Sequence, residues 1–215
     1  MRKTILIPAL SSAVALTAAT GCAVLGLNGG TMAIASKEQV MIGASEWKGV
    51  DDCSATATLK KIDGNLVVSV DVTDDYICKK GYEPYEKDSV ELYFDLRPGK
   101  ERGQTYYARG VFQMIIDLPK EDGKAKIYWY QGEGEDPSIA IPGSSAMYVK
   151  TKNGYNIIVT IPLKGIAEKH YPVGDTINFA FGVNDIDKNG IRTQMMGAGS
   201  DLNFQDPSKL ATISL

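Results

Sequence analysis

Residues 57–73 read ATLKKIDGNLVVSVDVT, and this stretch decides the fold class. The Asp63-Gly64 pair is typical of a two-residue hairpin turn, because both residue types tolerate the positive φ angles that such a turn needs. After the turn, residues 66–72 alternate apolar and polar side chains towards their end. A period of two indicates a strand with one buried face and one solvated face. The stretch therefore predicts an antiparallel hairpin.

The same period of two recurs along the rest of the chain. Further strands are predicted over residues 89–96, 106–118, 125–131, 147–152, 155–161, 176–185, 191–196 and 211–215. A bulge is expected at Arg109-Gly110, a surface loop over 132–145 and one short helix over 164–169. This many strands with so little helix predict a single all-β domain, an antiparallel β-sandwich.

The charge and histidine content exclude several classes of function. The 215 residues carry 23 Lys and Arg against 26 Asp and Glu, a formal net charge of −3, which does not suggest a nucleic-acid binder. His170 is the single histidine. Any Ser-His-Asp or Cys-His catalytic set, and any His-rich metal site, would have to use it. The composition therefore argues against an enzyme.

Residues 1–35 are predicted to be an export leader, because a short positive start precedes a long uncharged apolar run. Two cleavage points stay open. One lies after Gly21, where the lipobox-like ATGC would leave a lipid on Cys22 and anchor the protein to a membrane. The other lies after Ala35, at an A-x-A peptidase site. The mature domain, 36–215, is then expected in the bacterial envelope or secreted, with a net charge of −5 once two leader cations are lost.

Two cysteines remain after the leader, Cys53 and Cys78. Outside the cytoplasm such a pair is expected to oxidise to a disulfide. Across the predicted hairpin, Cys53 lies opposite a position near Asp74, a few residues short of Cys78. A disulfide is therefore predicted, with two free thiols as the alternative.

One acidic segment resembles a calcium-binding loop. Residues 185–190, DIDKNG, match the first half of an EF-hand loop, but Met196 stands at the twelfth position, where calcium needs a bidentate acid. A hairpin turn is expected instead. A looser calcium site that uses Asp185 or Asp187 together with another loop stays open.

Aromatic and acidic side chains suggest a sugar site. A pyranose offers flat C–H faces for stacking and hydroxyls for carboxylates. Tyrosine, the commonest aromatic here, tolerates a wet surface. On the predicted strand 89–96, Glu91 and Asp95 share a face, so they could share a ligand or a cation. Four aromatics are expected in loops or at strand ends: Trp47, Tyr82, Tyr85 and Phe204. They either bind sugar or cover the ends of the sandwich core.

Several of these segments resemble the family-nine carbohydrate-binding modules and their DOMON-like relatives. The resembling segments are SEW at 45–47, EPYEKDSVELYFD at 83–95, GY at 154–155, IPL at 161–163, VND at 183–185 and DPSKL at 206–210. They span nearly all of the mature chain in the right order. The resemblance implies a β-sandwich of jelly-roll or immunoglobulin-like form that clamps a sugar end between two aromatics, often with structural calcium. By position, Trp47 and Tyr85 would be the walls, Glu91 the hydroxyl-binding acid and Phe204 a supporting ring.

The chain also departs from the family pattern. The positions expected for the family's arginine and glutamine correspond here to Ile115 and Gly182, and the late loop asparagine corresponds to Asp201. A site that hydrogen-bonds hydroxyls loses discrimination when partners are missing, so the resemblance supports the fold more strongly than the ligand.

The sequence thus predicts an exported, non-catalytic carbohydrate-binding domain with no cofactor other than calcium. One alternative is a surface or interaction module that keeps the sandwich without binding sugar. Another is a DOMON-like redox module, in which Met195, Met196 or Met114 would bind haem together with His170.

Overall fold

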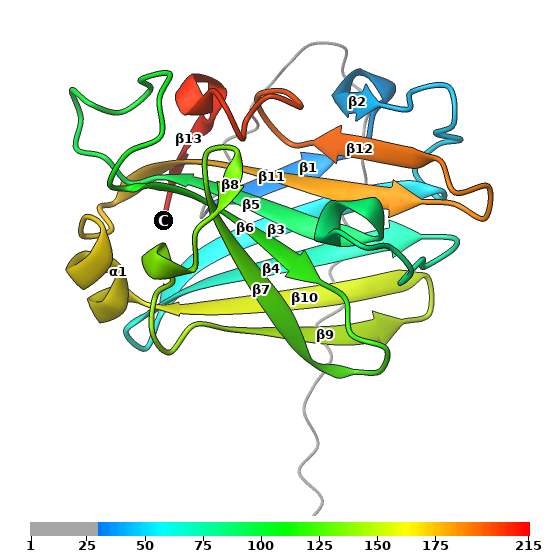
Figure 1. The fold of residues 1–215 in the computed structure, drawn as a ribbon, viewed down its shortest axis with the longest axis horizontal. Helices are drawn as coiled ribbons and strands as arrows, with labels where there is room; N and C mark the ends of the chain where they lie inside the picture. The colour runs from blue at the N-terminus through cyan, green and yellow to red at the C-terminus, as the bar shows by residue number, and fades with distance from the viewer. Residues whose placement is uncertain (1–29) are drawn as a thin grey trace, which may run out of the picture.

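The computed structural model describes residues 30–215, and these form a domain of antiparallel strands (Figure 1). The expected lipid site at Cys22 and the cleavage point after Gly21 lie outside the described residues. No helix within 30–215 is both long enough and apolar enough to cross a membrane.

The strands are β1 (Thr31–Ile34), β2 (Val40–Ile42), β3 (Cys53–Ile62), β4 (Asn65–Asp74), β5 (Ser89–Asp95), β6 (Val111–Asp117), β7 (Gly123–Gln131), β8 (Gly134–Glu135), β9 (Ser145–Thr151), β10 (Gly154–Pro162), β11 (Thr176–Ile186), β12 (Arg192–Met196) and β13 (Ala211–Ser214). Helix α1 covers Leu163–Lys169, and four 3-10 turns cover Lys37–Gln39 (η1), Pro84–Glu86 (η2), Pro137–Ile139 (η3) and Pro207–Lys209 (η4).

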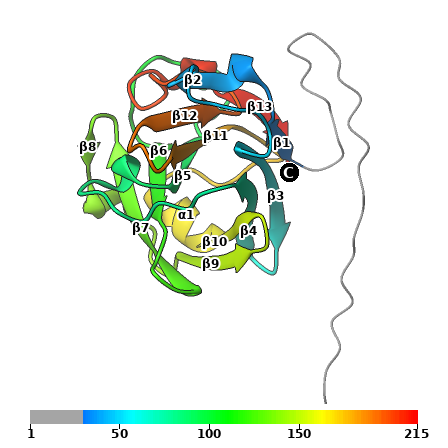
Figure 2. The ribbon, with the colours of Figure 1, turned by 90° about the vertical axis from the view of Figure 1, so that its right-hand side faces the viewer.

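The strands form two facing layers that share β7 (Figure 2). We call the layer β1-β3-β4-β10-β9 sheet A and the layer β6-β5-β11-β12-β2 sheet B, with β13 paired to β11. Residues 123–125 of β7 pair with β9, and residues 126–130 pair with β6. Because one strand bends from one layer into the other, the sheets curl into a single sandwich. The predicted antiparallel β-sandwich is confirmed.

The hairpin that decided the fold class forms as predicted. Asp63 and Gly64 adopt φ angles of 48° and 75°, and Ile62 pairs with Asn65 across the turn. Both positive φ angles suit a hairpin turn whose twist matches that of the strands. The apolar side chains of β4, such as Val68, point into the core between the sheets.

Strand β5 is buried on both faces. Val90, Leu92 and Phe94 belong to the main core between the sheets, whereas Tyr93 packs in a second apolar cluster. Alternation along a strand puts neighbouring residues on opposite faces, so Glu91 lies on the outer face of sheet B with Tyr93. This division of faces agrees with the prediction.

Two boundaries differ from the predictions. Strand β6 begins at Val111, and Gly110 with φ 93° lies in the turn before it instead of forming a bulge inside a longer strand. A Cβ at Gly110 would approach the Tyr171 ring to 2.5 Å, which explains the glycine. Residues Thr31–Ile34, which the sequence placed in the leader, form β1 along β3, and Ile34 is fully buried.

Candidate functional site

Glu91 lies at the centre of the outer face of sheet B. It pairs with Ile115 on β6 and with Gly182 on β11, so neither of its cross-strand partners offers a polar side chain. Only 2% of Glu91 is exposed. A buried carboxylate is costly unless charged or hydrogen-bonding partners surround it.

Four side chains, three from other strands of sheet B and Tyr93 from β5 itself, supply hydrogen bonds to Glu91. Asn184 Nδ2 donates to Glu91 Oε1 over 2.7 Å, and Gln113 Nε2 donates to Oε2 over 3.2 Å. Gln194 Nε2 lies 3.4 Å from both carboxylate oxygens, and the Tyr93 hydroxyl donates to Oε2. Burial and the Glu91 charge raise the pKa of Tyr93 well above its usual range. We call Glu91 and these four residues the Glu91 network.

Arg192 connects this network to the surface. Its Nε donates to Asn184 Oδ1 over 2.9 Å, and its Nη2 lies 3.8 Å from Glu91 Oε1. The guanidinium carbon lies 5.6 Å from the centre of the Tyr85 ring, within the range of a cation–π contact. The Arg192 side chain keeps 28% exposure, so a ligand can reach it.

Tyr85 is held out at the surface by the η2 turn. Glu83 and Glu86 close this turn as a reciprocal capping box, and buried Pro84 anchors it. Tyr85 itself is 37% exposed. A fixed turn that presents a partly exposed ring suits stacking against a ligand, because little conformational entropy is lost on binding.

Two further tyrosines extend the aromatic surface. Register places Tyr128 beside Ile115 and Tyr130 beside Gln113, so both rings share the outer face with Glu91. Both are partly exposed. Burial, with the charges of Glu135 and Glu83, raises the pKa of Tyr130 to about 12.

The loop before η4 covers the other end of this face. Phe204 packs against the cluster of Tyr93, Ala180, Met196 and Leu210. The Tyr107 hydroxyl donates to the Asn203 carbonyl over 2.6 Å and ties this loop to the one before β6. Phe204 therefore lies on the same outer face of sheet B as Glu91.

Trp47 is placed differently from the expected sugar-facing wall. It packs against the main core, and its indole N–H donates to the Cys53 carbonyl over 2.8 Å. An indole donor that is partly buried needs such an acceptor. The structure groups Tyr85, Glu91 and Phe204 on the outer face of sheet B but does not bring Trp47 to them.

Asp95 shares the outer face with Glu91, but its carboxylate is paired with Arg97. Arg97 Nε donates to Asp95 Oδ1 over 2.9 Å, and Arg97 Nη2 donates to Oδ2 over 2.8 Å. This buried two-point pair satisfies Asp95 within the fold.

The candidate calcium ligands fall into two acidic groups. Asp74, Asp88 and Asp185 are buried, with carboxylate oxygens within 4.8 Å of one another. Burial, with the neighbouring charge of Asp74, raises the pKa of Asp185 to about 8, and burial also raises the pKa of Asp74 and of Asp88. Three close oxygen donors without a basic side chain among them suit a hard cation such as calcium.

Asp187 belongs to the second group, with Asp52 and Asp75. The Lys48 ammonium lies 2.7 Å from Asp187 Oδ2 and 3.5 Å from Asp52 Oδ1, and so neutralises part of this group. Of the two predicted metal ligands, Asp185 lies in the buried acidic group, and Asp187 is paired with Lys48.

The predicted disulfide is absent from this structure, where Cys53 and Cys78 are free thiols. Cys53 does pair with Asp74 across the hairpin, as expected. The chain then turns towards β5, where Asp88 Oδ2 accepts from the Cys78 N–H and Cys78 O accepts from the Asp88 N–H. These bonds hold Cys78 beside β5 instead of β3.

The proposed haem ligands serve structural roles. His170 stacks on Phe112 at 4.6 Å, and its Nδ1 accepts from the Gly110 N–H over 3.3 Å. Met114 and Met195 are fully buried in the main core. Met196 packs in the second cluster. Haem binding therefore gains no support from this arrangement.

The comparisons with known proteins agree on one family. The family model for carbohydrate family 9 binding domain-like proteins matches residues 31–215. Exoglucanase XynX of Acetivibrio thermocellus is 31% identical over 145 residues, which is 67% of this chain and 12% of that protein. Endo-1,4-beta-xylanase A of Thermoanaerobacterium saccharolyticum is 32% identical over 141 residues, 65% of this chain and 11% of that protein. The chain thus spans only a small part of these relatives.

Two solved structures share the fold. A family 9 carbohydrate-binding module from Caldicellulosiruptor kristjanssonii in complex with cellotriose matches with a TM-score of 0.61 at 19% identity, covering 82% of this chain and 80% of that one. A complex of such a module from the same organism with glucose matches with a TM-score of 0.58 at 21% identity, covering 76% of each chain. The chain belongs to the carbohydrate family 9 binding domain-like family, a family of non-catalytic carbohydrate-binding modules.

Proposed function

We propose that the outer face of sheet B binds a glucose unit of a gluco-oligosaccharide such as cellotriose. The observation that carries the proposal is the buried Glu91 carboxylate, which is held by hydrogen bonds and joined to the surface by Arg192 over the Tyr85 ring. Structural relatives that share this fold were solved with cellotriose and with glucose.

Each part of the site would have a separate task. Tyr85 offers its exposed ring to the C–H face of a pyranose, and Phe204 supports the opposite end of the face. The Arg192 guanidinium presents several N–H donors in a fixed plane to neighbouring hydroxyl oxygens. The Glu91 network holds Arg192 in place, so the donors are arranged before the sugar arrives.

Isothermal titration with cellotriose tests this function. We expect saturable binding by the unaltered protein and a loss of binding in Arg192→Met. Lys188→Met is the matched control, because Lys188 is an exposed cation in the neighbouring turn. If the unaltered protein binds no glycan at millimolar concentration, an interaction module that does not bind sugar becomes the better interpretation of this domain.

Calcium is proposed at Asp74, Asp88 and Asp185. These residues come from the end of β4, the start of β5 and β11, so a cation there would cross-link sheet A to sheet B. Its charge would offset three buried carboxylates, which is a structural task and not a catalytic one. Asp88 already accepts from the Ile186 N–H over 2.8 Å, which fixes one ligand in position.

The chain is further proposed to be exported and to act beside carbohydrate-degrading enzymes, because its matched relatives are an exoglucanase and a xylanase. Processing before Cys22 is favoured over processing after Ala35, since the later cut would remove β1 with its buried Ile34. The mature protein would then be lipid-anchored in the bacterial envelope. The intact mass of protein extracted from membranes tests this: a mature chain beginning at residue 36 contradicts it.

The Cys53–Cys78 disulfide is retained only as a proposal for the oxidising compartment outside the cytoplasm. Its formation would require the segment that carries Cys78 to leave its hydrogen bonds with Asp88. The unreduced mass of the exported protein decides the matter, since two free thiols exclude the bond.

A further inference from the structure

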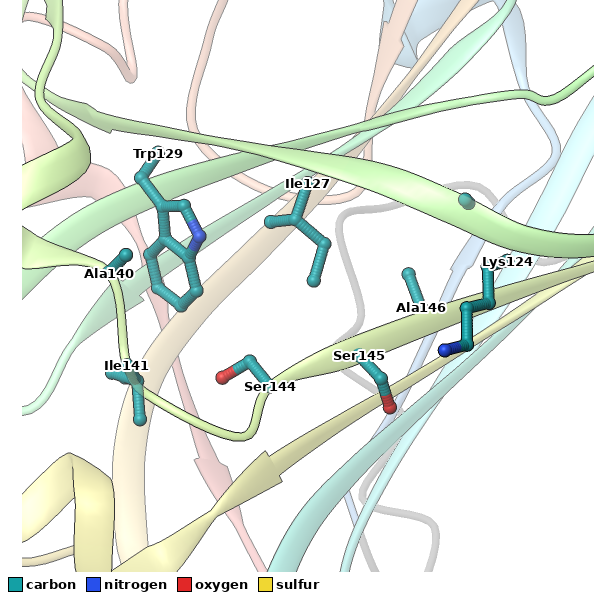
Figure 3. A pocket seen from close by; sticks show the side chains of 9 residues that line it. Lys124, Ile127, Trp129, Ala140, Ile141, Ser144, Ser145 and Ala146 are labelled. Carbon is teal, nitrogen blue, oxygen red and sulfur yellow. The ribbon is translucent and has the colours of Figure 1, made fainter.

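A cavity of about 380 Å³ lies between β7, the start of β9 and the loop before β9 (Figure 3). None of its lining residues belongs to the Glu91 network. Its volume falls at the lower end of the range for small-molecule sites, roughly 300–1,000 Å³. The cavity is lined by Lys124, Ala125, Ile127, Trp129, Ala140, Ile141, Ser144, Ser145 and Ala146. We call it the wedge pocket.

The wedge pocket results from the way in which β7 joins the two sheets. Residues 123–125 pair with β9, but from residue 126 onward β7 pairs with β6. The two strands therefore separate just after Ala125 and Ala146, and a wedge opens between them. The loop that contains η3 crosses the wide end of this wedge, where Ile141 faces Trp129 (Figure 3).

The walls of the wedge pocket are apolar. Ile127 and Trp129 are inward-facing residues of β7, and Ile141 is a buried member of the main core. Trp129 and Ile141 are only 7% and 2% exposed, and Ile127 is partly exposed, so the gain on binding would come mainly from the apolar surface of the ligand itself, roughly 25 cal/mol per Å².

The polar groups of the wedge pocket all offer donors. The Ser144 hydroxyl is buried and has no hydrogen-bond partner among the described residues, and it points between Trp129 and Ile141 (Figure 3). The indole nitrogen of Trp129 also faces this space. Lys124 and Ser145 lie at the narrow end, and Lys124 takes part in none of the ion pairs found within residues 30–215.

We propose that the wedge pocket binds a small monocarboxylate with an apolar body, of the arylpropanoate class. Its carboxylate would accept from the Lys124 ammonium and the Ser145 hydroxyl, and its apolar body would lie against Ile127 and Trp129. Unpaired donors without an acidic side chain among them select an acceptor, and a free cation selects a negative charge. A buried hydroxyl without a partner is costly, so a polar substituent that reaches Ser144 would bind more tightly.

The test is a titration of the full ¹⁵N-labelled chain with 3-phenylpropanoate, followed through the tryptophan indole N–H signals. The chain has two tryptophans, and Trp129→Phe assigns the signal of Trp129. We expect a saturable shift of the Trp129 signal, with Kd on the order of 1 mM, while the Trp47 signal stays unchanged.

Variants of the protein separate the contribution of the Lys124 charge from that of the shape of the wedge pocket. Lys124→Met and the neutral 3-phenylpropanamide should each weaken binding about fivefold, the effect of losing one exposed ion pair. Lys126→Met is the matched control, because its ammonium lies 3.8 Å over the Tyr128 ring and not in the pocket. Ala140→Leu should close the pocket and abolish the shift, with an unchanged melting temperature showing that the variant is folded.

Three results would overturn the proposal. One is an unmoved Trp129 signal at about 10 mM acid, where a millimolar site would be mostly filled. Another is equal binding of the acid and the amide, which would remove the role of Lys124. The third is a shift of the Trp129 signal by cellotriose, which would make the wedge pocket an additional sugar site.

Discussion

Removing divalent cations should destabilise the protein at alkaline pH, and the acidic group of Asp74, Asp88 and Asp185 sets the size of the effect. The three carboxylates lie within 4.8 Å of one another. At an effective dielectric constant of about 20, each ionised pair at that distance repels by about 3.5 kcal/mol, so three pairs cost about 10 kcal/mol. Domains are stable by only about 5–15 kcal/mol, so the group must bind either a cation or protons.

The sign of the pH dependence follows from Asp185. Burial raises its folded-state pKa to about 8, above the unfolded value of about 3.9. Without a cation, the folded protein holds a proton that the unfolded chain releases, so this stabilisation is complete below the unfolded pKa and is lost as the pH rises through 8. Calcium competes with that proton and should therefore stabilise more at pH 8 than at pH 5.5.

Scanning calorimetry with calcium and with EDTA at both pH values measures the effect. Calcium at a hundred times its Kd adds about 2.7 kcal/mol, which corresponds to a rise in Tm of about 5–11 °C at pH 8. Asp185→Asn should lose most of this rise, whereas Asp63→Asn, in an exposed turn, should keep it. Equal Tm values in calcium and EDTA at pH 8 would refute the reasoning, as would full calcium stabilisation of Asp185→Asn.

Three further results are expected. Tyr85→Ala should weaken cellotriose binding about tenfold by calorimetric titration, since the lost stacking is worth about 1.4 kcal/mol, whereas Tyr82→Ala, at a position 92% exposed, should leave it unchanged. Arg192→Lys should weaken the same binding by a similar factor, because a single ammonium does not reproduce the planar donors. Burial lowers the pKa of His170, so the stability it confers is full above the unfolded value and is lost as the pH falls through the folded value. Urea unfolding between pH 7 and 5 should show this loss, and His170→Gln should reduce it; an identical pH dependence in both proteins would contradict the role of the Gly110–His170 hydrogen bond.

The strands could be predicted because each one carries its own periodic signal. The turn at Asp63-Gly64 and the alternation of β5 both depend on local sequence, and both are confirmed. The predicted start of β6 was wrong, because the sequence does not show that Gly110 has a positive φ and packs against the Tyr171 ring. Tyr171 is far from Gly110 in the sequence. Strand β1 was assigned to the leader because its apolar residues resemble a signal sequence, and only pairing with β3 distinguishes the two.

The candidate site could be predicted only in part. Tyr85, Glu91 and Phe204 were found through the resemblance to the family, but the partners of Glu91 were not. Gln113 and Gln194 reach Glu91 through the register of β6 and β12, which no local pattern of the sequence reveals. Ile115 and Gly182, which pair with Glu91, thus have amide side chains from other positions close to them.

The remaining misses in the site have related causes. Arg192 stands at the start of β12, where its guanidinium meets both the Glu91 carboxylate and the Tyr85 ring. The alternation of β5 predicted which face of the sheet Tyr93 lies on, but not the hydrogen bond from its hydroxyl to Glu91. Sequence alone also does not show that the Trp47 indole N–H donates to the Cys53 carbonyl, which holds Trp47 against the main core.

The central claim is that cellotriose binds on the outer face of sheet B against Arg192 and Tyr85. The most direct measurement is the Arg192 side-chain Nε–H signal during titration of the ¹⁵N-labelled protein with cellotriose, since this N–H donates to Asn184 in the free protein. We expect this signal to shift and saturate, and to need about ten times more cellotriose for the same shift when Tyr85 is replaced by alanine. A fixed Arg192 signal while cellotriose binds elsewhere, or no binding at all, would contradict the account.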